Sequence, residues 1–398
     1  MEKQDKTREK NSKKQTCIKL NLSDYYQMHE NAIKVCKAMD ETGKYYWKAG
    51  EVKHGLEELV FYEGDPHLYL MSKDDIFNAV CKVAYSERKN GLPPRYFINY
   101  IYNMCADETP FKPLEQIVRI PMFSSDGRLM IEPGYYAEDM VLYIPYEGID
   151  VRISPNPTEE EIKEAKSVLE NDVLADFRFI SPADKTHALA YLLLFFVRKM
   201  INGPTPLHIF EANDQRAASF LMRKLTPDRC VVLDNPTDSE FRKNVRQKLT
   251  CRPEEKVSAF CLENISKLKL PALEYMLSVQ KYCDRIPGKN KTVDAEIKWI
   301  LAIAGEKIVI DTHTTLKRVK IEFYSKKDFE FYYDKEKTVE DMNKIIQSGL
   351  TLAQTWVAAG CPKMYKTVSS RFIEWSEVMG SLLAFHGYSD FLSNNEYR

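Results

Sequence analysis

The sequence predicts an α/β fold built on a parallel sheet, with a mixed α/β region before it and helices after it. Residues 207–210 form an apolar run, a polar turn follows, and residues 217–225 have the period of an amphipathic helix. Two further apolar runs, at 257–263 and from Trp299 onward, have the character of buried strands. From Thr338 the pattern is helical, which indicates that helices close the fold.

Length and composition place the chain among globular proteins. With 398 residues, of which 44% are hydrophobic, it is long enough for two or three domains with well-filled cores. The longest apolar run, 188–197, is shorter than the roughly 18 residues of a membrane span, so we expect a buried helix there. The 9 cysteines are scattered and include no Cys-x-x-Cys pair, which favours a reducing cytoplasm. We therefore predict a cytoplasmic protein without a metal ion or another cofactor.

The first 153 residues predict a tail and a separate domain. Residues 1–16 are basic and lack an apolar core, so we expect a disordered tail and no secretory signal. Residues 17–153 alternate strand-like runs with helices and form the predicted N-terminal domain. Three helices are expected in it, at 25–39 with Ser23 as the cap, at 73–85 with Ser72 as the cap, and at 95–105.

A predicted hairpin closes the N-terminal domain. Two strand-like runs flank Asp126-Gly127, a turn sequence typical of a β-hairpin, and we expect a β-rich collar here. Thr158 is a helix cap followed by three glutamates, which are favourable in a first helical turn. We place the domain boundary at residue 154, with a core at 154–325 and a helical lid at 326–398.

The strand, turn and helix at 207–225 form the frame of a phosphate-binding loop without its chemistry. Such a loop needs glycines that bring backbone N–H groups against the phosphates, a lysine, and a Ser or Thr hydroxyl that holds Mg²⁺. The turn contains neither lysine nor threonine, and no glycine lies between Gly203 and Gly288.

On these and other segments the chain resembles the AAA+ ATPase-like proteins of phages and mobile genetic elements, which are often attached to primases or act as replicative helicases. The resemblance implies a P-loop NTPase core with a parallel sheet. It is carried by the lead-in Gly203-Pro204-Thr205-Pro206, by Trp356 and Trp375 in the C-terminal helices, and by the hairpin residues Pro121, Phe123, Asp126, Gly127, Leu129, Pro133, Gly134 and Tyr135.

Matched to the family pattern without a gap, the phosphate-binding positions hold other residues. Glu211 stands for the family's Asp, and Arg216 and Ala218 occupy glycine positions. Ser219 occupies the lysine position and Phe220 the position of the Mg²⁺-binding hydroxyl. Every nucleotide-contacting side chain of the motif is therefore replaced.

The other nucleotide elements are partly retained. Glu263-Asn264 ends a strand where the family has Asp-Asn, so Glu263 is either a remnant of the Mg²⁺-anchoring acid or a capping or salt-bridging residue. No Asn follows the strand at Trp299, where the family places its sensor. Arg318 matches an arginine that, in AAA+ rings, reaches the nucleotide of the neighbouring subunit.

Basic residues concentrate downstream of the phosphate-binding frame. Residues 242–330 contain 19 Lys or Arg against 12 Asp or Glu, although the whole chain has a net charge of −1. A basic face on a balanced protein indicates nucleic-acid binding, and a solvated helix surface or exposed turn is the alternative. The candidate phosphate contacts are Arg242, Lys243, Arg246, Lys248, Arg285, Lys289 and Lys291.

Joint loss of the glycines, lysine, hydroxyl and sensor predicts a pseudo-ATPase. We expect a non-catalytic protein of a mobile genetic element that binds DNA or a catalytically active AAA+ or replication partner, as an accessory or loader. One alternative is an ATPase or helicase subunit whose site another chain completes. A second is a structural subunit of a phage or defence assembly. Alone, the protein is expected to be a monomer or small oligomer that does not bind membranes.

Overall fold

The computed structural model describes residues 17–87, 90–288, 292–310, 318–325, 338–366 and 372–394. The chain forms two compact units, Met1–Gln116 and Ile117–Arg398. This boundary lies before residue 154, the position predicted from the sequence. The structure assigns the predicted collar to the second unit because Phe123, Met130 and Val141 are buried in the same hydrophobic cluster as the helices that follow them.

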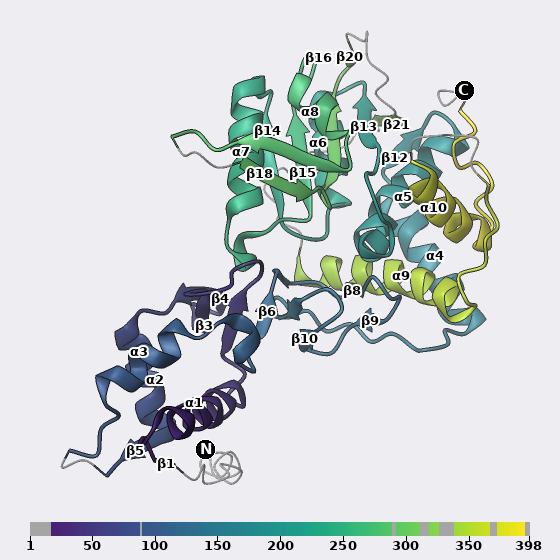
Figure 1. The fold of residues 1–398 in the computed structure, drawn as a ribbon. Helices are drawn as coiled ribbons and strands as arrows, with labels where there is room; N and C mark the ends of the chain where they lie inside the picture. Colours follow the sequence, from purple (N-terminus) through teal and green to yellow (C-terminus); the bar gives the residue numbers. More distant parts are fainter. Residues whose placement is uncertain are drawn as a thin grey trace, which may run out of the picture. The chain divides into compact units, whose positions relative to one another are not determined.

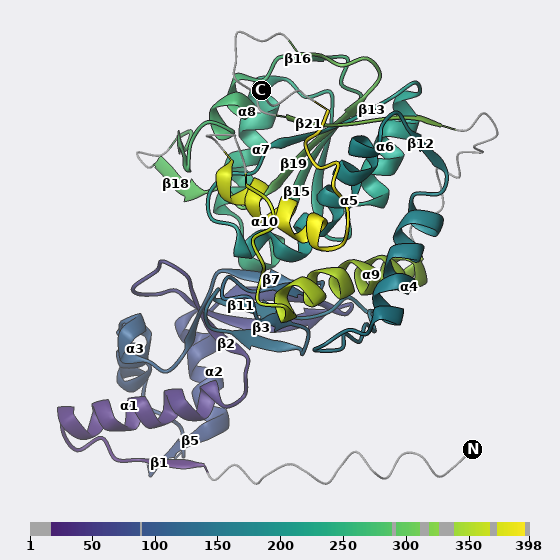
Figure 2. The same ribbon diagram turned by 90° about the vertical axis from the view of Figure 1, so that its right-hand side faces the viewer.

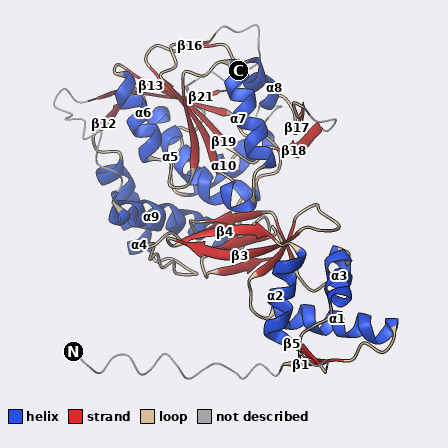
Figure 3. Ribbon diagram, turned by 90° about the vertical axis from the view of Figure 1, so that its left-hand side faces the viewer, coloured by secondary structure: helices blue, strands red, loops and turns tan. Residues whose placement is uncertain are grey.

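The first unit packs three helices against a four-stranded sheet (Figure 3). The sheet order is β4-β3-β2-β6, and a separate parallel pair joins β1 to β5. Its elements are β1 (Ile18–Leu20), α1 (Tyr25–Asp40), β2 (Tyr45–Lys48), β3 (Leu56–Tyr62), β4 (Asp65–Leu70), α2 (Lys73–Val83), β5 (Ala84–Ser86), α3 (Arg95–Asn103) and β6 (Lys112–Leu114).

Two predicted details of these helices are wrong. The cap of α1 is Asp24 and not Ser23, because the Asp24 carboxylate accepts the N–H of Gln27 at 2.8 Å. Helix α2 begins after Ser72 as predicted but ends at Val83, since the next three residues pair with β1. Tertiary pairing overrides helical periodicity there.

The collar consists of two small sheets within the second unit. β7 (Gln116–Val118), β10 (Gly134–Tyr136) and β11 (Val141–Tyr143) form one, in the order β10-β11-β7. β8 (Met122–Phe123) and β9 (Leu129–Met130) pair antiparallel around Asp126-Gly127, which confirms the predicted hairpin. Gly127 has a φ of +82°, a conformation that favours glycine.

A six-stranded, largely parallel sheet organises the second unit (Figure 2). Its order is β12-β21-β13-β19-β15-β14, and only β12 runs antiparallel to its neighbour. The strands are β12 (Phe177–Phe179), β13 (Leu207–Ala212), β14 (Cys230–Asp234), β15 (Ala259–Glu263), β19 (Ile300–Gly305) and β21 (Arg318–Ser325). The protein is thus a mixed α/β protein, as predicted.

Helices cover both faces of this sheet (Figure 1). Successive residues of a strand face opposite sides, so Phe210 joins one hydrophobic cluster and Ile209 the other. The first cluster includes helices α4 (Glu159–Ser167), α5 (Pro182–Val197), α6 (Gln215–Lys224), α9 (Val339–Ala358) and α10 (Ile373–Phe385). The second includes helices α7 (Asp238–Thr250) and α8 (Pro271–Met276).

Two predictions about these helices hold. Helix α5 is buried along nearly its whole length, as its apolar run indicated, and α9 and α10 supply the helices expected in the C-terminal region. Both C-terminal helices contribute to the core of the sheet's first face. Among the described residues, no helix combines the length and apolarity that crossing a membrane would require.

Two pairs of short strands belong to the second face of the sheet. β16 (Lys267–Leu268) pairs with β20 (Val309–Ile310), and β17 (Lys281–Arg285) pairs antiparallel with β18 (Thr292–Glu296). The second pair forms a ribbon just before β19. We call it the basic hairpin, because its strands flank the candidate residues Lys289 and Lys291, which lie outside the described residues.

Candidate functional site

The topology singles out one edge of the parallel sheet as the candidate site. From β13 the chain continues to β14 at one end of the sheet, whereas from β19 it continues to β21 on the other side of β13. In open α/β sheets, ligands bind outside the carboxyl ends of strands at such a switch point. The edge contains Glu211 of β13, Glu263 of β15 and Gly305 of β19.

The connection between β13 and α6 is too short to wrap around phosphates. Only Asn213 and Asp214 separate the two elements. Asp214 caps α6, and its Oδ1 accepts the backbone N–H of Arg216 at 2.9 Å. The start of a helix attracts anions because its first N–H groups are unpaired within the helix. Here the protein's own carboxylate occupies that position.

Three of the four predicted motif residues in α6 have different surroundings. The Arg216 side chain lies 3.5 Å from the Asp214 carboxylate. Ser219 is buried, and its hydroxyl has no hydrogen-bond partner within the described part of the chain. The ring of Phe220 lies 6.2 Å from the ring of Phe177, measured between centroids. The lysine and hydroxyl positions therefore serve packing on the sheet's first face.

Glu263 forms an ion pair within the chain. Both of its oxygens accept hydrogen bonds from the guanidinium of Arg223, on α6. The Glu263 side chain is 7% exposed and that of Arg223 is 55% exposed, so the pair closes the edge from the solvent side. This arrangement agrees with the salt-bridging interpretation of Glu263. Its carboxylate is not available to anchor a Mg²⁺-bound water without breaking the pair.

Asn264 and Glu211 are held in the same way. The Asn264 amide accepts a hydrogen bond from Gln215 and donates one to Asp234. Glu211 lies 3.3 Å from Lys320 Nζ and accepts the backbone N–H of Ile308 at 3.2 Å. Burial lowers the pKa of Lys320, but its bonds to Glu322 and Glu211 outweigh burial and raise that pKa overall.

Backbone contacts also hold the strand ends together beside the switch point. Ile265 donates its N–H to the carbonyl of Ala304 at 3.1 Å. A Cβ atom placed on Gly305 would lie 2.0 Å from the Ile265 carbonyl oxygen. The segment that follows β19 reaches Glu211 through Ile308. Short contacts therefore join the ends of β13, β15 and β19 at this edge.

Arg318 does not belong to this edge. It begins β21 and is opposite Leu207, the first residue of β13, so it lies at the amino end of the sheet. The fold separates it from Glu211 and Glu263, which lie at carboxyl ends.

The basic helix α7 uses most of its predicted phosphate contacts internally. Arg242 pairs with Asp238 at 2.8 Å, and Arg246 pairs with Asp284 of the basic hairpin at 2.9 Å. Lys248 donates to the carbonyl of Glu255 at 3.1 Å. Lys243, the fourth predicted phosphate contact of α7, is exposed.

The basic hairpin has one buried and one exposed face. Tyr282 and Val293 face inward, whereas Lys281, Cys283 and Arg285 are exposed along β17. Lys281 is opposite Glu296, so the positive charge is partly balanced across the ribbon. Arg285 is opposite Thr292 and has no acidic residue directly across from it.

Sequence reasoning missed Asp214, Arg223 and Lys320. The first had a detectable signal, because an Asp directly before an amphipathic run is a typical helix cap. The other two pair with acids 40 and 109 positions away. Only the strand order brings those residues together.

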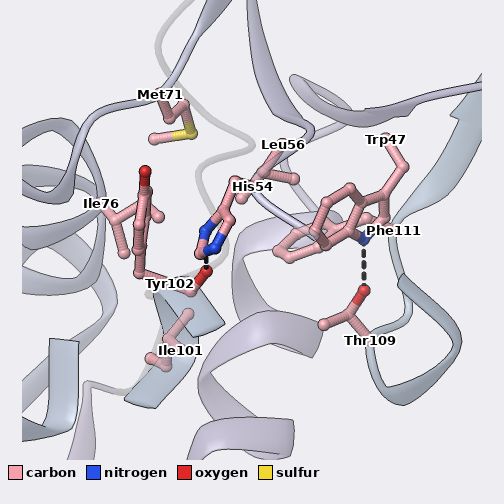
Figure 4. Close-up of a pocket in the computed structure, with 9 residues that line it drawn as sticks. All are labelled: Trp47, His54, Leu56, Met71, Ile76, Ile101, Tyr102, Thr109 and Phe111. Carbon is pink, nitrogen blue, oxygen red and sulfur yellow. Dashed lines mark hydrogen bonds between the residues drawn. The ribbon is translucent and has the colours of Figure 1, made fainter. Parts of the chain in front are cut away.

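Two hollows are lined by residues that do not belong to this edge. One, of about 610 Å³, is lined by residues of the β12–α5 region, namely Glu170, Asn171, Leu174, Ala175, Phe177, Phe179, Ile180, Ser181, Pro182 and Lys185. The other, in the first unit, measures about 10 Å³ and lies among Trp47, His54, Tyr102 and their neighbours (Figure 4). The second has room for about one water molecule. Within the described residues, no group of three or more His, Cys, Asp or Glu has a metal-binding arrangement.

Comparisons with known proteins give a distant structural similarity. No family model matches the chain, and no curated protein matches it. The solved structures that resemble it include three apo structures of the NrS-1 C-terminal region. The first has 11% identity and a TM-score of 0.39 and covers 92% of this chain and 76% of that one. The second has 11% identity and a TM-score of 0.38, with coverages of 89% and 75%. The third has 12% identity and a TM-score of 0.40, with coverages of 91% and 76%. At this level of similarity the chemistry has to be argued from the chain's own residues.

Proposed function

We propose that this chain is a non-hydrolysing, AAA+-like protein of a mobile genetic element that acts by binding DNA or a replication partner. The observation that supports this most directly is the Asp214 carboxylate at the start of α6. A phosphate approaching the same N–H groups meets a like charge in the position it would need.

The bonds around Asp214 and Glu263 add to the exclusion of a nucleotide. A nucleotide would have to displace Asp214 and separate Glu263 from Arg223, and it would gain no lysine or glycine contacts in return. Each hydrogen bond to a charged group contributes about 1.5–3 kcal/mol, so the loss of three or four lowers affinity by several orders of magnitude. The six-stranded sheet with its switch point supports descent from a nucleotide-binding fold whose ligand has been replaced by side chains.

Turnover of Mg-ATP tests the non-hydrolysing part of the proposal. We expect no hydrolysis above that of the Glu263→Gln variant, because a contaminating ATPase does not respond to a change in this chain. Ser219→Lys should also remain inactive, since its side chain would begin from a buried position and the glycines would still be absent. Hydrolysis by the wild type that disappears in Glu263→Gln would refute the proposal.

The basic hairpin is the surface that we propose for nucleic acid. Arg242 and Arg246 each pair with an acid and Lys248 donates to a carbonyl, whereas Lys243 and Arg285 are exposed, so the proposal gives the last two the main role. Lys289 and Lys291 remain predictions from the sequence. Contacts to phosphates by such residues give sequence-independent binding that weakens steeply with salt.

Fluorescence anisotropy with a labelled single strand and a duplex at several salt concentrations tests this surface. Arg285→Glu should weaken binding about tenfold and reduce the salt dependence, and Lys289→Glu combined with Lys291→Glu should do so further. Lys53→Glu, at an exposed position of the first unit, is the matched control for charge. Equal affinity of the wild type and the three variants for nucleic acid would show that the hairpin does not bind it and would favour a protein partner.

A further inference from the structure

The edge strand β14 differs from the edge strand at the opposite end of the same sheet. β12 has three residues and carries an exposed charge, Arg178, at its centre. β14 has five residues, Cys-Val-Val-Leu-Asp, and no charge before its last position. Short length and central charges are the devices that protect sheet edges from pairing with other chains. β12 has both, and β14 lacks a central charge.

The outer side of β14 has no neighbouring strand within the described residues. Asn235 donates its N–H to the Glu263 carbonyl at 2.9 Å, which shows which residues face β15. In a parallel strand, every second residue directs its peptide N–H and C=O groups to the same neighbouring strand. The peptide groups of Val231 and Leu233 therefore also point toward β15, and those of Val232 and Asp234 point outward. Val232 is 42% exposed.

We propose that β14 is a dimerisation edge, at which a second copy of this chain adds its own β14 in antiparallel orientation. The outward residues are symmetric about Val232, with Cys230 two positions before it and Asp234 two positions after it. A two-fold axis at Val232 sets it opposite Val232 of the second copy and sets each Cys230 opposite an Asp234. The outward N–H and carbonyl of Val232 then meet those of Val232 in the second copy, and no two like charges are directly opposed.

The charge pattern of α7 favours the same two-fold arrangement. This helix follows β14 after three residues and covers one face of the sheet, so the axis sets the two α7 helices antiparallel on that face. The first turn of α7 contains Asp238 and Glu240, and its later turns contain Lys243 and Lys248. The acidic end of one helix is therefore directed along the basic end of the other, as an isologous interface requires.

This inference goes beyond the proposed function: the basic hairpin takes no part in the strand pairing, although Lys243 of α7 belongs to both proposed surfaces. It gives the expected small oligomer a specific form, a dimer with one continuous sheet.

Sedimentation velocity over a wide concentration series tests the proposal. The wild type should show a concentration-dependent dimer. Val232→Lys introduces the charge that edge strands use against pairing and should raise the dimer Kd at least about tenfold. Val232→Pro should act similarly, since it removes an outward N–H at a position where an edge strand tolerates proline. Val52→Lys, at a 63% exposed valine outside the strand, should dimerise like the wild type.

A cross-linking variant checks the register. Residues in a hydrogen-bonded antiparallel pair have Cα atoms about 5.5 Å apart, which is within disulfide range. Val232→Cys should therefore form a covalent dimer under mild oxidation, well above the level given by Val52→Cys. A wild type that is monomeric at every concentration, or a dimer that both Val232→Lys and Val232→Pro leave intact, would overturn the proposal. Unchanged thermal unfolding of the variants shows that the fold itself is preserved.

Discussion

The carboxyl edge of the six-stranded sheet and the basic hairpin are both rich in charged residues but use them differently. At the edge, Asp214, Glu263 and Glu211 each bond to a group of the same chain. On the hairpin, Lys281 and Arg285 extend into solvent from a ribbon whose other face is buried. Charges paired in the interior contribute to stability, whereas exposed charges are available to a ligand. The comparison shows that the acidic residues of the edge are bonded within the chain, whereas the basic residues of the hairpin are exposed.

The largest effect on stability is expected from adding a methyl group at Gly305, where the strand ends lie close together. Gly305→Ala places a Cβ 2.0 Å from the Ile265 carbonyl, so the strand ends must separate. We expect a loss of more than about 3 kcal/mol in the free energy of unfolding, or failure to fold. Gly64→Ala, in the β3–β4 turn of the first unit, has open space and a φ of +85° and should cost only about 1 kcal/mol. Equal effects measured by urea denaturation would show that the edge is not tightly closed.

A second prediction concerns how stability depends on pH, to which His208 of β13 should contribute. Burial lowers the pKa of His208 to about 3, against an unfolded value of about 6.5. Between these values the unfolded chain binds a proton that the folded chain does not, so stability falls as pH decreases. From pH 7 to pH 5 this amounts to about 2 kcal/mol for one histidine.

His208→Phe should remove that part of the pH dependence. Denaturant unfolding at several pH values provides the measurement. His67→Phe, at a partly exposed position of β4, is the control and should follow the wild type. Burial also lowers the pKa of His386, to about 4. Part of the dependence of stability on pH will therefore remain in every variant. An identical slope in His208→Phe and the wild type would contradict the account of His208.

A smaller effect is expected from the ion pair. Glu263→Gln removes one charge of a half-exposed pair, and we expect a loss of about 1 kcal/mol. Asp294→Asn on the exposed face of the hairpin should change stability by less than about 0.5 kcal/mol. A larger loss in Asp294→Asn than in Glu263→Gln, measured by urea denaturation, would reverse the contrast between the two regions.

Much of the fold could be predicted from the sequence, and the pairing within the site could not. Residues 207–225 gave the strand and the helix because periodicity is local, and Asp126-Gly127 gave the hairpin because turn chemistry is local. The pairing of Arg223 with Glu263 depends on which strands are neighbours. The same holds for Arg246, a predicted phosphate contact, which pairs with Asp284 in the structure. Side-chain type alone does not distinguish these two uses of an arginine.

Calorimetric titration of the protein with Mg-ATP tests the central claim most directly. The account predicts no saturable heat at millimolar nucleotide and no change in the unfolding temperature, because Asp214 and the Arg223–Glu263 pair occupy the positions that phosphate and Mg²⁺ would need. Saturable, Mg²⁺-dependent binding in the wild type that is lost in Glu263→Gln would contradict it.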